Sequence, residues 1–428
     1  MSSFWAEDAW LGRPARRVLV EVDGERISTL REDTDPPPAA TRLPGLLLPG
    51  LANAHSHAFQ RALRAAAEGA GPTFWEWRQA MYDVAAKLRP DSYRRLAQAV
   101  YGEMALAGIT AVGEFHYLHH QPGGEPYADP NEMGEALIDA AREAGVRLTL
   151  LDACYLRGGA GRPLEGAQLR FGDGDAERWR DRVERLAPTP GARIGAAIHS
   201  GRAVDEASMG VVAAWAQERG APLHMHLLER REELADDPLE AAENAGVLGP
   251  GTTVIHATHA GGGFERLVES GTGICLCRTT ERFLADGHVD GLEPWRAQAR
   301  LSLGTDSHAS VDIFEEARAV ELDHRSRAET RGLYTADLLL EAATAGGYAA
   351  LGQQGGRLEP GQLADFICVD MSSPRTAAAA PAAAVLVFAA SATDVTDVVV
   401  GGRHVVRDRQ HQTIPDVGRE LREAIAAL

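Results

Sequence analysis

The middle of the chain alternates between short apolar runs and longer segments whose apolar residues recur every three or four positions. Segments of the second kind, such as 130–145 and 206–220, predict amphipathic helices, and a glycine ends each pattern where a helix C-terminus favours one. The short runs predict eight strands, at roughly 46–57, 110–117, 147–155, 193–199, 222–227, 252–259, 273–277 and 301–306. Eight strands that alternate with helices over about 250 residues predict a (β/α)8 barrel.

Both ends of the chain show period-two alternation instead. Residues 16–30 alternate apolar and polar side chains around Asp23-Gly24, which predicts a hairpin. Residues 363–370 and 394–408 also predict short strands, and two glycines interrupt the second of these segments. Because these strand-rich segments flank the barrel pattern, we expect them to meet in one small β domain.

The patterns together predict an α/β protein in which a (β/α)8 TIM barrel carries a small β-sandwich domain built from both chain ends. The expected boundaries place residues 46–355 in the barrel and residues 1–45 and 356–428 in the two parts of the small domain. The alternative for the middle is a doubly wound open sheet, which is disfavoured because no G-x-G-x-x-G follows the first strand.

The composition argues against several classes of protein. The chain has 428 residues, and 61 acidic against 43 basic side chains give a net charge of −18, which opposes binding to nucleic acid or an anionic membrane. Four cysteines make no disulfide framework. The N-terminal residues lack the basic and apolar segments of a signal peptide. We therefore expect a cytoplasmic protein without nucleic-acid or membrane partners.

Polar residues stand where the predicted barrel strands end. They are His55 and His57, His199, His226, His256 and Asp306. Barrel enzymes place their active-site residues at the C-terminal ends of the strands, so these side chains should face one mouth. Burying so many polar groups without partners would be too costly, which favours a functional site over a purely structural role.

The pair His55 and His57 lies on an extended segment with one residue between them, so both imidazoles face the same side of the strand. Together with His226 and Asp306 they make a set of three imidazoles and one carboxylate. Such a set, with a water at an open position, suits one divalent metal ion. Zn²⁺ is the first expectation and Fe²⁺ the alternative.

Four motifs resemble the signature of the amidohydrolase superfamily, and they occur in its order at predicted strands one, five, six and eight. They are PGLANAHSH (49–57), HLLE (226–229), HATH (256–259) and GTDSH (304–308). The segment LEPGQLADFICVD (358–370) resembles the return segment of that superfamily's small β domain. The resemblance covers essentially the whole chain and implies a metal-dependent hydrolase of the mononuclear aminohydrolase branch.

The lysine content bears on the number of metal ions. Binuclear members of the superfamily bridge two metals with a carboxylated lysine at the end of the fourth strand. Here the fourth predicted strand ends in His199, and the single lysine of the chain, Lys87, lies in a helical region between the first two strands. The resemblance therefore implies one metal ion.

Further motifs resemble the formimidoylglutamate deiminase family. They are HSHAFQRALR (55–64), FWEWR (74–78), AVGEFHYLHHQPGG (111–124), AIHSGRAV (197–204) and TTERFLADG (279–287). This resemblance implies hydrolytic deimination of N-formimino-L-glutamate to N-formyl-L-glutamate and ammonia, in histidine degradation. It also implies a small dicarboxylate as substrate and a homodimer as the assembly.

The resemblance implies roles for individual residues. Asp306 would take a proton from the attacking water, His256 would orient the attacking oxygen, and Glu229 would deliver a proton to the leaving nitrogen. Because the net charge of −18 opposes a dianion, local arginines must bind its carboxylates. The candidates for substrate binding are Arg78 and Arg202, with Gln60, Tyr117 and His199 as hydrogen-bonding partners.

Two residues and three rival functions stay open. Arg278 is an unassigned positive group at the end of the seventh strand, and His308 is a candidate for supporting the metal ligands from behind. One rival is a related aminohydrolase that acts on a nucleobase or on another formimino or guanidino acid. The others are an imidazolonepropionase-like hydrolase of cyclic amides and a metal-free scaffold. The motifs FWEWR and GEFHYLHHQ favour the deiminase, and the complete ligand set disfavours the scaffold.

Overall fold

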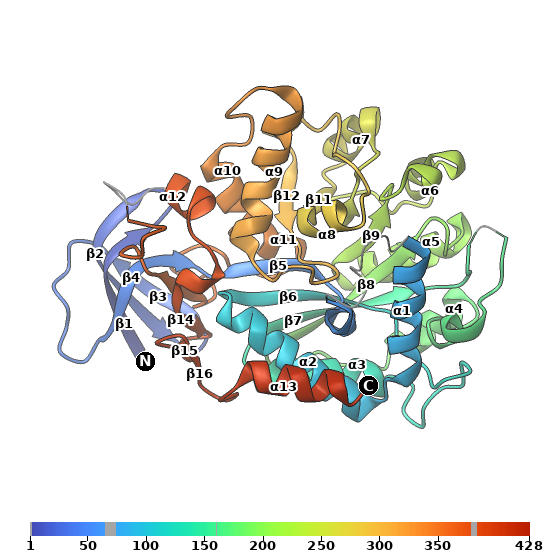
Figure 1. The fold of residues 1–428 in the computed structure, drawn as a ribbon, viewed down its shortest axis with the longest axis horizontal. Coiled ribbons are helices and arrows are strands. Elements are labelled where there is room, and N and C mark those ends of the chain that lie inside the picture. Colours follow the sequence, from blue (N-terminus) through green and yellow to red (C-terminus); the bar gives the residue numbers. More distant parts are fainter. Residues whose placement is uncertain (1, 65–73, 160, 378–382) are drawn as a thin grey trace.

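The computed structural model describes residues 2–64, 74–159, 161–377 and 383–428. Eight parallel strands form the central sheet, in the order in which they occur along the chain (Figure 1). They are β5 (Leu51–Ser56), β6 (Ile109–His116), β7 (Arg147–Cys154), β8 (Ala192–Ser200), β9 (Leu223–Leu227), β10 (Thr252–His256), β11 (Gly273–Leu276) and β12 (Arg300–Leu303). The expected (β/α)8 architecture is confirmed.

The first and last of these strands meet through a short bridge beyond the end of β12. Ser56 pairs with Asp306 in parallel fashion. The His57 N–H donates to the Asp306 carbonyl at 3.1 Å, and the Asp306 N–H donates to the His55 carbonyl at 3.0 Å. The hydrogen bonds that close the barrel therefore join the segments that carry three of the predicted metal ligands.

Helices alternate with the strands and surround the central sheet. They are α1 (Phe74–Lys87), α2 (Pro90–Leu106), α3 (Glu132–Ala144), α4 (Ala176–Val183), α5 (Glu206–Arg219), α6 (Pro238–Asn244), α7 (Phe264–Glu269), α8 (Arg278–Phe283), α9 (Ile313–Ala328), α10 (Ala336–Glu341) and α11 (Gly347–Ala350). Gly145 and Gly220 cap α3 and α5 with φ of 78° and 56°, in the left-handed region where glycine carries no Cβ penalty. No helix of the described residues has the length and apolar character that a membrane crossing requires.

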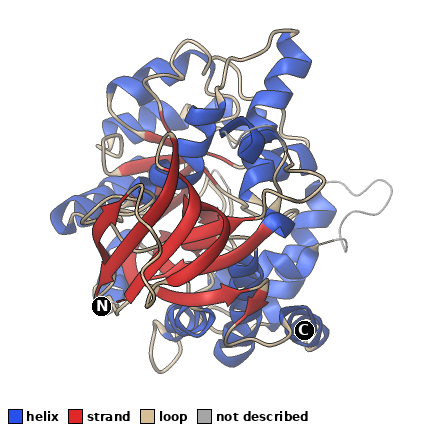
Figure 2. Ribbon diagram, turned by 90° about the vertical axis from the view of Figure 1, so that its left-hand side faces the viewer, coloured by secondary structure: helices blue, strands red, loops and turns tan. Residues whose placement is uncertain are grey.

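Both chain ends build a second sheet beside the barrel (Figures 1 and 2). Its strands are β1 (Ser2–Trp10), β2 (Pro14–Asp23), β3 (Arg26–Arg31), β4 (Thr41–Pro49), β13 (Phe366–Val369), β14 (Val395–Val400), β15 (Arg403–Arg407) and β16 (Gln410–His411). One hydrogen-bonded ladder runs through all of them, in the order β16-β15-β14-β13-β4-β1-β2-β3. The antiparallel pairing of β13 with β4 joins the two ends of the chain, and buried side chains such as Phe4, Leu47 and Phe366 form the core.

The N-terminal sheet extends beyond the expected boundary at residue 45, because β4 continues to Pro49 before the chain enters the barrel as β5. The change of sheet takes place at Gly50. A Cβ there would lie 2.1 Å from Thr110 Oγ1, so the close approach of the two segments requires glycine. A single apolar run in the sequence thus supplies one strand to each sheet.

The C-terminal part of the chain divides between the small domain and the barrel. Helix α12 (Ala383–Phe388) packs on α9 and α10, and α13 (Val417–Ala426) lies along α2. Val417 and Ile414 approach α2 so closely at Gly102 that a Cβ there would lie within 3.2 Å of both side chains. The segment 356–428 was expected to belong to the small β domain throughout, and its two helices instead cover the barrel.

A buried ion pair joins the two domains. Arg147, at the start of β7, donates Nε and Nη2 to the two carboxylate oxygens of Asp365 at 2.7 and 3.1 Å, and Nη1 to Glu25 at 2.8 Å. Asp365 also accepts from the Tyr348 hydroxyl and the Gly401 amide, each at 2.8 Å. Every polar group of the pair thus has a partner, which buried charges require.

Replacing Arg147 by Met should lower the free energy of unfolding by about 3–5 kcal/mol, because it leaves the buried Asp365 carboxylate without its cation. Urea denaturation followed by circular dichroism measures the loss. Arg94→Met is a suitable control, since it removes an arginine paired with Glu143 in a partly exposed setting and should cost less than about 1 kcal/mol. If both variants lost the same free energy of unfolding, the buried pair of Arg147 and Asp365 would contribute no more than a surface ion pair, contrary to this prediction.

Candidate metal centre and active site

Four side chains converge at the C-terminal mouth of the barrel. Single ligand atoms of His55, His57, His226 and Asp306 all lie within 4.8 Å of one another. Asp306 Oδ1 is 3.3 Å from His55 Nε2 and 3.4 Å from His57 Nε2, and the Nε2 atoms of His55 and His226 are 3.1 Å apart. The structure therefore brings the predicted ligands together from β5, the residue after β5, β9 and the loop after β12.

The donor atoms of this cluster fit a divalent metal ion. His57 Nδ1 donates to the Phe115 carbonyl at 3.0 Å, and His226 Nδ1 donates to the His199 carbonyl at 2.7 Å. These bonds place the proton on Nδ1 and leave the Nε2 lone pair for a metal. Burial lowers the pKa of His55, His57 and His226, so the imidazoles are neutral, as metal ligands must be.

His256 lies beside the cluster but is held differently. Its Nδ1 donates to Glu281 at 3.2 Å, while its Nε2 lies 3.9 Å from both Glu229 Oε1 and Asp306 Oδ2. Burial opposes a charge on the ring, but Glu229, Glu281 and Asp306 together raise the pKa of His256 well above its usual value. His256 is therefore a hydrogen-bond donor that faces the same space as Glu229 and Asp306.

Arg278 lies behind His256 and does not line the pocket that adjoins the four-residue cluster. It pairs with Glu281, one turn further along α8, and reaches Asp323 of α9 at 2.9 Å. Burial alone would raise the pKa of Glu281, but Arg278 and His256 lower it to about 2. The unassigned positive group of the sequence is thus part of the support that fixes the His256 ring.

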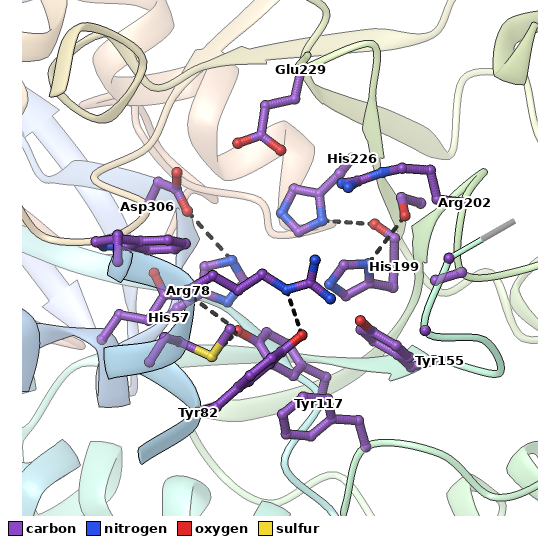
Figure 3. Close-up of a pocket in the computed structure, with 18 of the residues that line it drawn as sticks. His57, Arg78, Tyr82, Tyr117, Tyr155, His199, Arg202, His226, Glu229 and Asp306 are labelled. Atoms are coloured by element: carbon purple, nitrogen blue, oxygen red, sulfur yellow. Dashed lines mark hydrogen bonds and ion pairs between the residues drawn. The ribbon is translucent and has the colours of Figure 1, made fainter. Parts of the chain in front are cut away.

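A pocket of about 810 Å³, including its open mouth, adjoins the cluster (Figure 3). All five predicted substrate-binding residues line it: Gln60, Arg78, Tyr117, His199 and Arg202. Their side chains come from different elements, yet Figure 3 shows the guanidinium group of Arg78 pointing towards His199 and Arg202. Glu229 and Asp306 line the same pocket, and Glu229, after Glu233, helps to raise the pKa of Arg202 against the effect of burial.

Specific contacts orient these groups. Arg78 Nε donates to the Tyr82 hydroxyl at 2.6 Å, and Gln60 Nε2 donates to the Tyr117 hydroxyl at 3.0 Å. Arg202 Nη2 lies 3.5 Å from Oε1 of the buried Glu233, which holds one edge of the guanidinium. The arginines are thus positioned before any ligand arrives, which lowers the entropy lost on binding.

Several lining residues escaped the sequence reasoning. They are Trp77, Met81, Tyr82, Tyr155, Arg157 and Phe171. Tyr155 and Arg157 directly follow β7, so the same rule that found the polar ends of the other strands could have found them. The remaining four lie on α1 or in the segment before α4, where no strand end marks them.

Two further histidines of the barrel make structural contacts. His308 lies behind the ligand strand, with Nε2 3.2 Å from Ser56 Oγ and Nδ1 3.1 Å from Thr305 Oγ1. His224 points into a deeper part of the barrel, where Nε2 donates to the Ala350 carbonyl at 2.9 Å. His308 thus supports the segment between the ligands His55 and His57, and neither ring lines the pocket.

A second group with ligand-type side chains consists of His116, His119 and Asp152. Its carboxylate is already occupied, because Arg182 donates to the two oxygens of Asp152 at 2.7 and 2.9 Å and Trp179 Nε1 donates at 3.0 Å. A guanidinium this close repels a metal cation. We therefore interpret this group as a buried ionic contact between β7 and α4.

Comparison with known proteins assigns the family. The amidohydrolase family matches residues 46–405, and formimidoylglutamate deiminase from Pseudomonas aeruginosa is 38% identical over 437 residues, with 96% of each chain covered. The chain belongs to the amidohydrolase family. The resemblance to the deiminase seen in the sequence is confirmed, and this amidohydrolase acts on carbon–nitrogen bonds by hydrolysis.

Other relatives show how widely the amidohydrolase architecture is used. An 8-oxoguanine deaminase from Pseudomonas aeruginosa is 30% identical over 421 residues, covering 93% of this chain and 91% of its own. The crystal structure of an amidohydrolase from Brucella melitensis has a TM-score of 0.90 at 30% identity and covers 100% of this chain and 99% of its own. The chain is therefore similar in sequence to proteins whose names give different substrates.

Lys87 is remote from the mouth of this amidohydrolase. It is the last residue of α1, its side chain is exposed, and it does not line the pocket. The fourth barrel strand ends with His199 and Ser200. No lysine is therefore placed to bridge two metals, in agreement with a mononuclear ligand set.

The pH dependence of stability should reveal a buried acid next to α8. Glu316 of α9 accepts hydrogen bonds from the Thr279 amide, at 3.0 Å, and from the Thr279 hydroxyl. Burial raises its pKa from 4.5 to about 8. The folded state then holds a proton that the unfolded chain has lost, so the contribution of Glu316 to stability falls as the pH rises from about 5 to about 8.

Glu316→Gln should flatten this part of the stability profile. Urea unfolding at pH 5, 6.5 and 8 measures it. The two proteins should have similar stability at pH 5, and the variant should be more stable at pH 8 by more than about 1 kcal/mol, since one pKa unit corresponds to about 1.4 kcal/mol. Parallel profiles for the two proteins would show that Glu316 is ionised in the folded state.

Proposed function

We propose that this amidohydrolase is a metal-dependent deiminase that converts N-formimino-L-glutamate and water into N-formyl-L-glutamate and ammonia, a step in histidine degradation. The observation that carries the proposal is the pair of guanidinium groups, Arg78 and Arg202, on one side of a pocket that borders the four-ligand cluster. A protein with a net charge of −18 has to concentrate positive charge locally to bind a dianion. The 38% identity to a formimidoylglutamate deiminase supports the same substrate.

His55, His57, His226 and Asp306 would hold one divalent metal ion, with Zn²⁺ as the first candidate and Fe²⁺ as the second. Three neutral imidazoles and a carboxylate are the donors that both ions accept. When bound, the metal supplies Lewis acidity that lowers the pKa of a water molecule.

Three residues of this chain then manage the protons of the reaction. Asp306 accepts a proton from the attacking water, and the N–H of His256 stabilises charge on the attacking oxygen. A new carbon–oxygen bond forms at the formimino carbon. Glu229 gives a proton to the departing nitrogen, and the proton held by Asp306 follows it. The carbon–nitrogen bond then breaks, the remaining hydroxyl proton passes to Glu229 as the carbonyl forms, and ammonia leaves with two added protons. The separation of 3.9 Å from His256 Nε2 to both carboxylates supports this shared task.

The carboxylates of the substrate would bind to Arg78 and Arg202, whose planar guanidinium groups match a carboxylate with two parallel hydrogen bonds. His199 is neutral, because burial and the charge of Arg202 lower its pKa well below the usual value. It can therefore offer one donor and one acceptor, as can the amide of Gln60. Tyr117, fixed by Gln60, completes the polar wall.

One observation favours a second candidate, the hydrolysis of an amino group on a nucleobase. Aromatic side chains, Trp77, Tyr155 and Phe171 among them, line the pocket and could stack on a planar ring. An 8-oxoguanine deaminase is 30% identical to this chain. The arginine pair favours the dicarboxylate, because a neutral base carries no carboxylate for guanidinium groups to bind.

The assay that separates these candidates measures ammonia release by the zinc-loaded protein. N-formimino-L-glutamate should be turned over, while guanine, adenosine and 8-oxoguanine should not. Glu229→Gln should lower kcat by about 10²–10⁴, the usual contribution of a positioned proton donor, and it also controls for contaminating activity. Turnover of a purine without turnover of the formimino acid would exclude the proposed reaction.

Metal analysis provides an independent measurement. After removal of metal with a chelator and addition of Zn²⁺, elemental analysis should find one tightly bound ion per chain. His226→Ala should abolish tight binding, because it removes one of the four donors. His116→Asn should leave the stoichiometry at one, since that side chain belongs to the group whose carboxylate is paired with Arg182. Two ions in the unmodified protein would rule out the mononuclear site.

A further inference from the structure

Arg157 lies on the wall of the active-site pocket, in the loop that follows β7. The amides of Leu156 and Arg157 both donate to the Ala203 carbonyl at 3.0 Å. Ala203 is the neighbour of Arg202, so these hydrogen bonds fasten the loop after β7 to the loop after β8. The backbone thus brings a third arginine to the same side of the pocket as Arg202.

The guanidinium of Arg157 has an unmet hydrogen-bonding requirement. Its Nε atom is buried and has no hydrogen-bond partner within the described chain, and the same is true of Nε in Arg202. A buried donor without a partner costs free energy, and an arginine cannot relieve that cost by losing its proton. Arg157 and Arg202 thus each keep hydrogen-bonding capacity that the described chain does not meet, on adjoining loops of the pocket wall.

The distribution of charge in the pocket indicates what that ligand carries. Arg78, Arg157 and Arg202 line it, while its carboxylates, Glu229 and Asp306, both lie within 3.9 Å of His256 Nε2. Burial lowers the pKa of Arg202, but Glu233 and Glu229 raise it, so that guanidinium is partly compensated. Arg78 and Arg157 bring two further positive charges to the pocket wall. An anion of the substrate, held away from the reacting carbon, fits this region.

We propose that Arg157 is a specificity-determining residue, which binds one of the two substrate carboxylates together with Arg202 and makes the enzyme selective for dicarboxylates. The inference rests on the proposed deiminase function, since it assumes a formimino acid in this pocket. It adds a residue that the sequence motifs did not include. Arg78 points towards the same space from α1.

The test compares the unmodified enzyme with Arg157→Met on three substrates. N-formimino-L-glutamate carries both carboxylates, N-formimino-4-aminobutyrate lacks the α-carboxylate, and N-formimino-2-aminobutyrate lacks the γ-carboxylate. The variant should raise KM for the dicarboxylate at least about tenfold and change kcat by less than about threefold, because a charge-assisted hydrogen bond to the ligand is lost while the reacting groups stay in place.

The KM values for the two monocarboxylates show whether Arg157 binds one particular carboxylate. The substitution should have almost no effect on the substrate that lacks the carboxylate bound by Arg157, and should keep its tenfold effect on the other. Arg157→Lys should recover part of the loss. An unchanged KM for the dicarboxylate, or equal losses on all three substrates, would overturn the proposal.

A matched control removes one positive charge elsewhere. Arg178 lies on the exposed face of α4, with 73% of its side chain exposed, and does not line the pocket. Arg178→Met should leave KM unchanged. A loss equal to that of Arg157→Met would mean that the long-range field of the protein, rather than contact with Arg157, accounts for the effect, and would also overturn the proposal.

Calorimetric binding of the product, N-formyl-L-glutamate, separates this proposal from the proposed reaction. Arg157→Met should weaken product binding at least about tenfold. If the unmodified protein binds the product but does not deiminate the formimino acid, the proposed reaction is wrong. Product binding by Arg157→Met then still decides whether Arg157 binds an anion. If the variant binds the product as tightly as the unmodified protein, Arg157 is excluded while the reaction is retained.

Discussion

The closure of the barrel between its first and last strands is the contact on which the active site depends. Two backbone hydrogen bonds, from His57 to Asp306 and from Asp306 to His55, hold residues that are about 250 positions apart in the chain in adjoining positions. Asp306 has a φ of 44° and His256 a φ of 69°, conformations that non-glycine residues adopt only when the surrounding structure imposes them. The donor cluster thus inherits its geometry from the closed sheet.

Support for the reacting groups comes from charges placed behind them. Arg278 pairs with Glu281, and Glu281 accepts a hydrogen bond from Nδ1 of His256. The Nε2 side of His256 therefore faces Glu229 and Asp306. A buried carboxylate or imidazolium is costly by itself, and this chain offsets the cost by pairing each charge with the next. The outermost partner, Asp323, lies on α9 and receives Arg278 at 2.9 Å.

The anion-binding side of the pocket solves a different electrostatic problem. The protein as a whole repels anions, so its attraction for a dicarboxylate has to arise over short distances, where guanidinium groups in a partly desolvated pocket act with little screening. Arg78, Arg157 and Arg202 come from three different elements, and the hydrogen bonds of two of their loops to one another keep them on the same side. The net charge of the chain does not show that these arginines lie together.

The sequence by itself determined the eight strands, the amphipathic helices ended by Gly145 and Gly220, and the polar residues at the strand ends, because these depend on local periodicity and on the rule that barrel strands end at one mouth. It did not show that β4 and β5 belong to different sheets, since an apolar run carries no mark where the backbone changes partners. Nor did it show that α12 and α13 cover the barrel, that Arg278 supports His256, or that Arg157 reaches the pocket. Those outcomes are set by which loops and helices pack together in three dimensions, and contacts between distant segments leave no periodic trace in the chain.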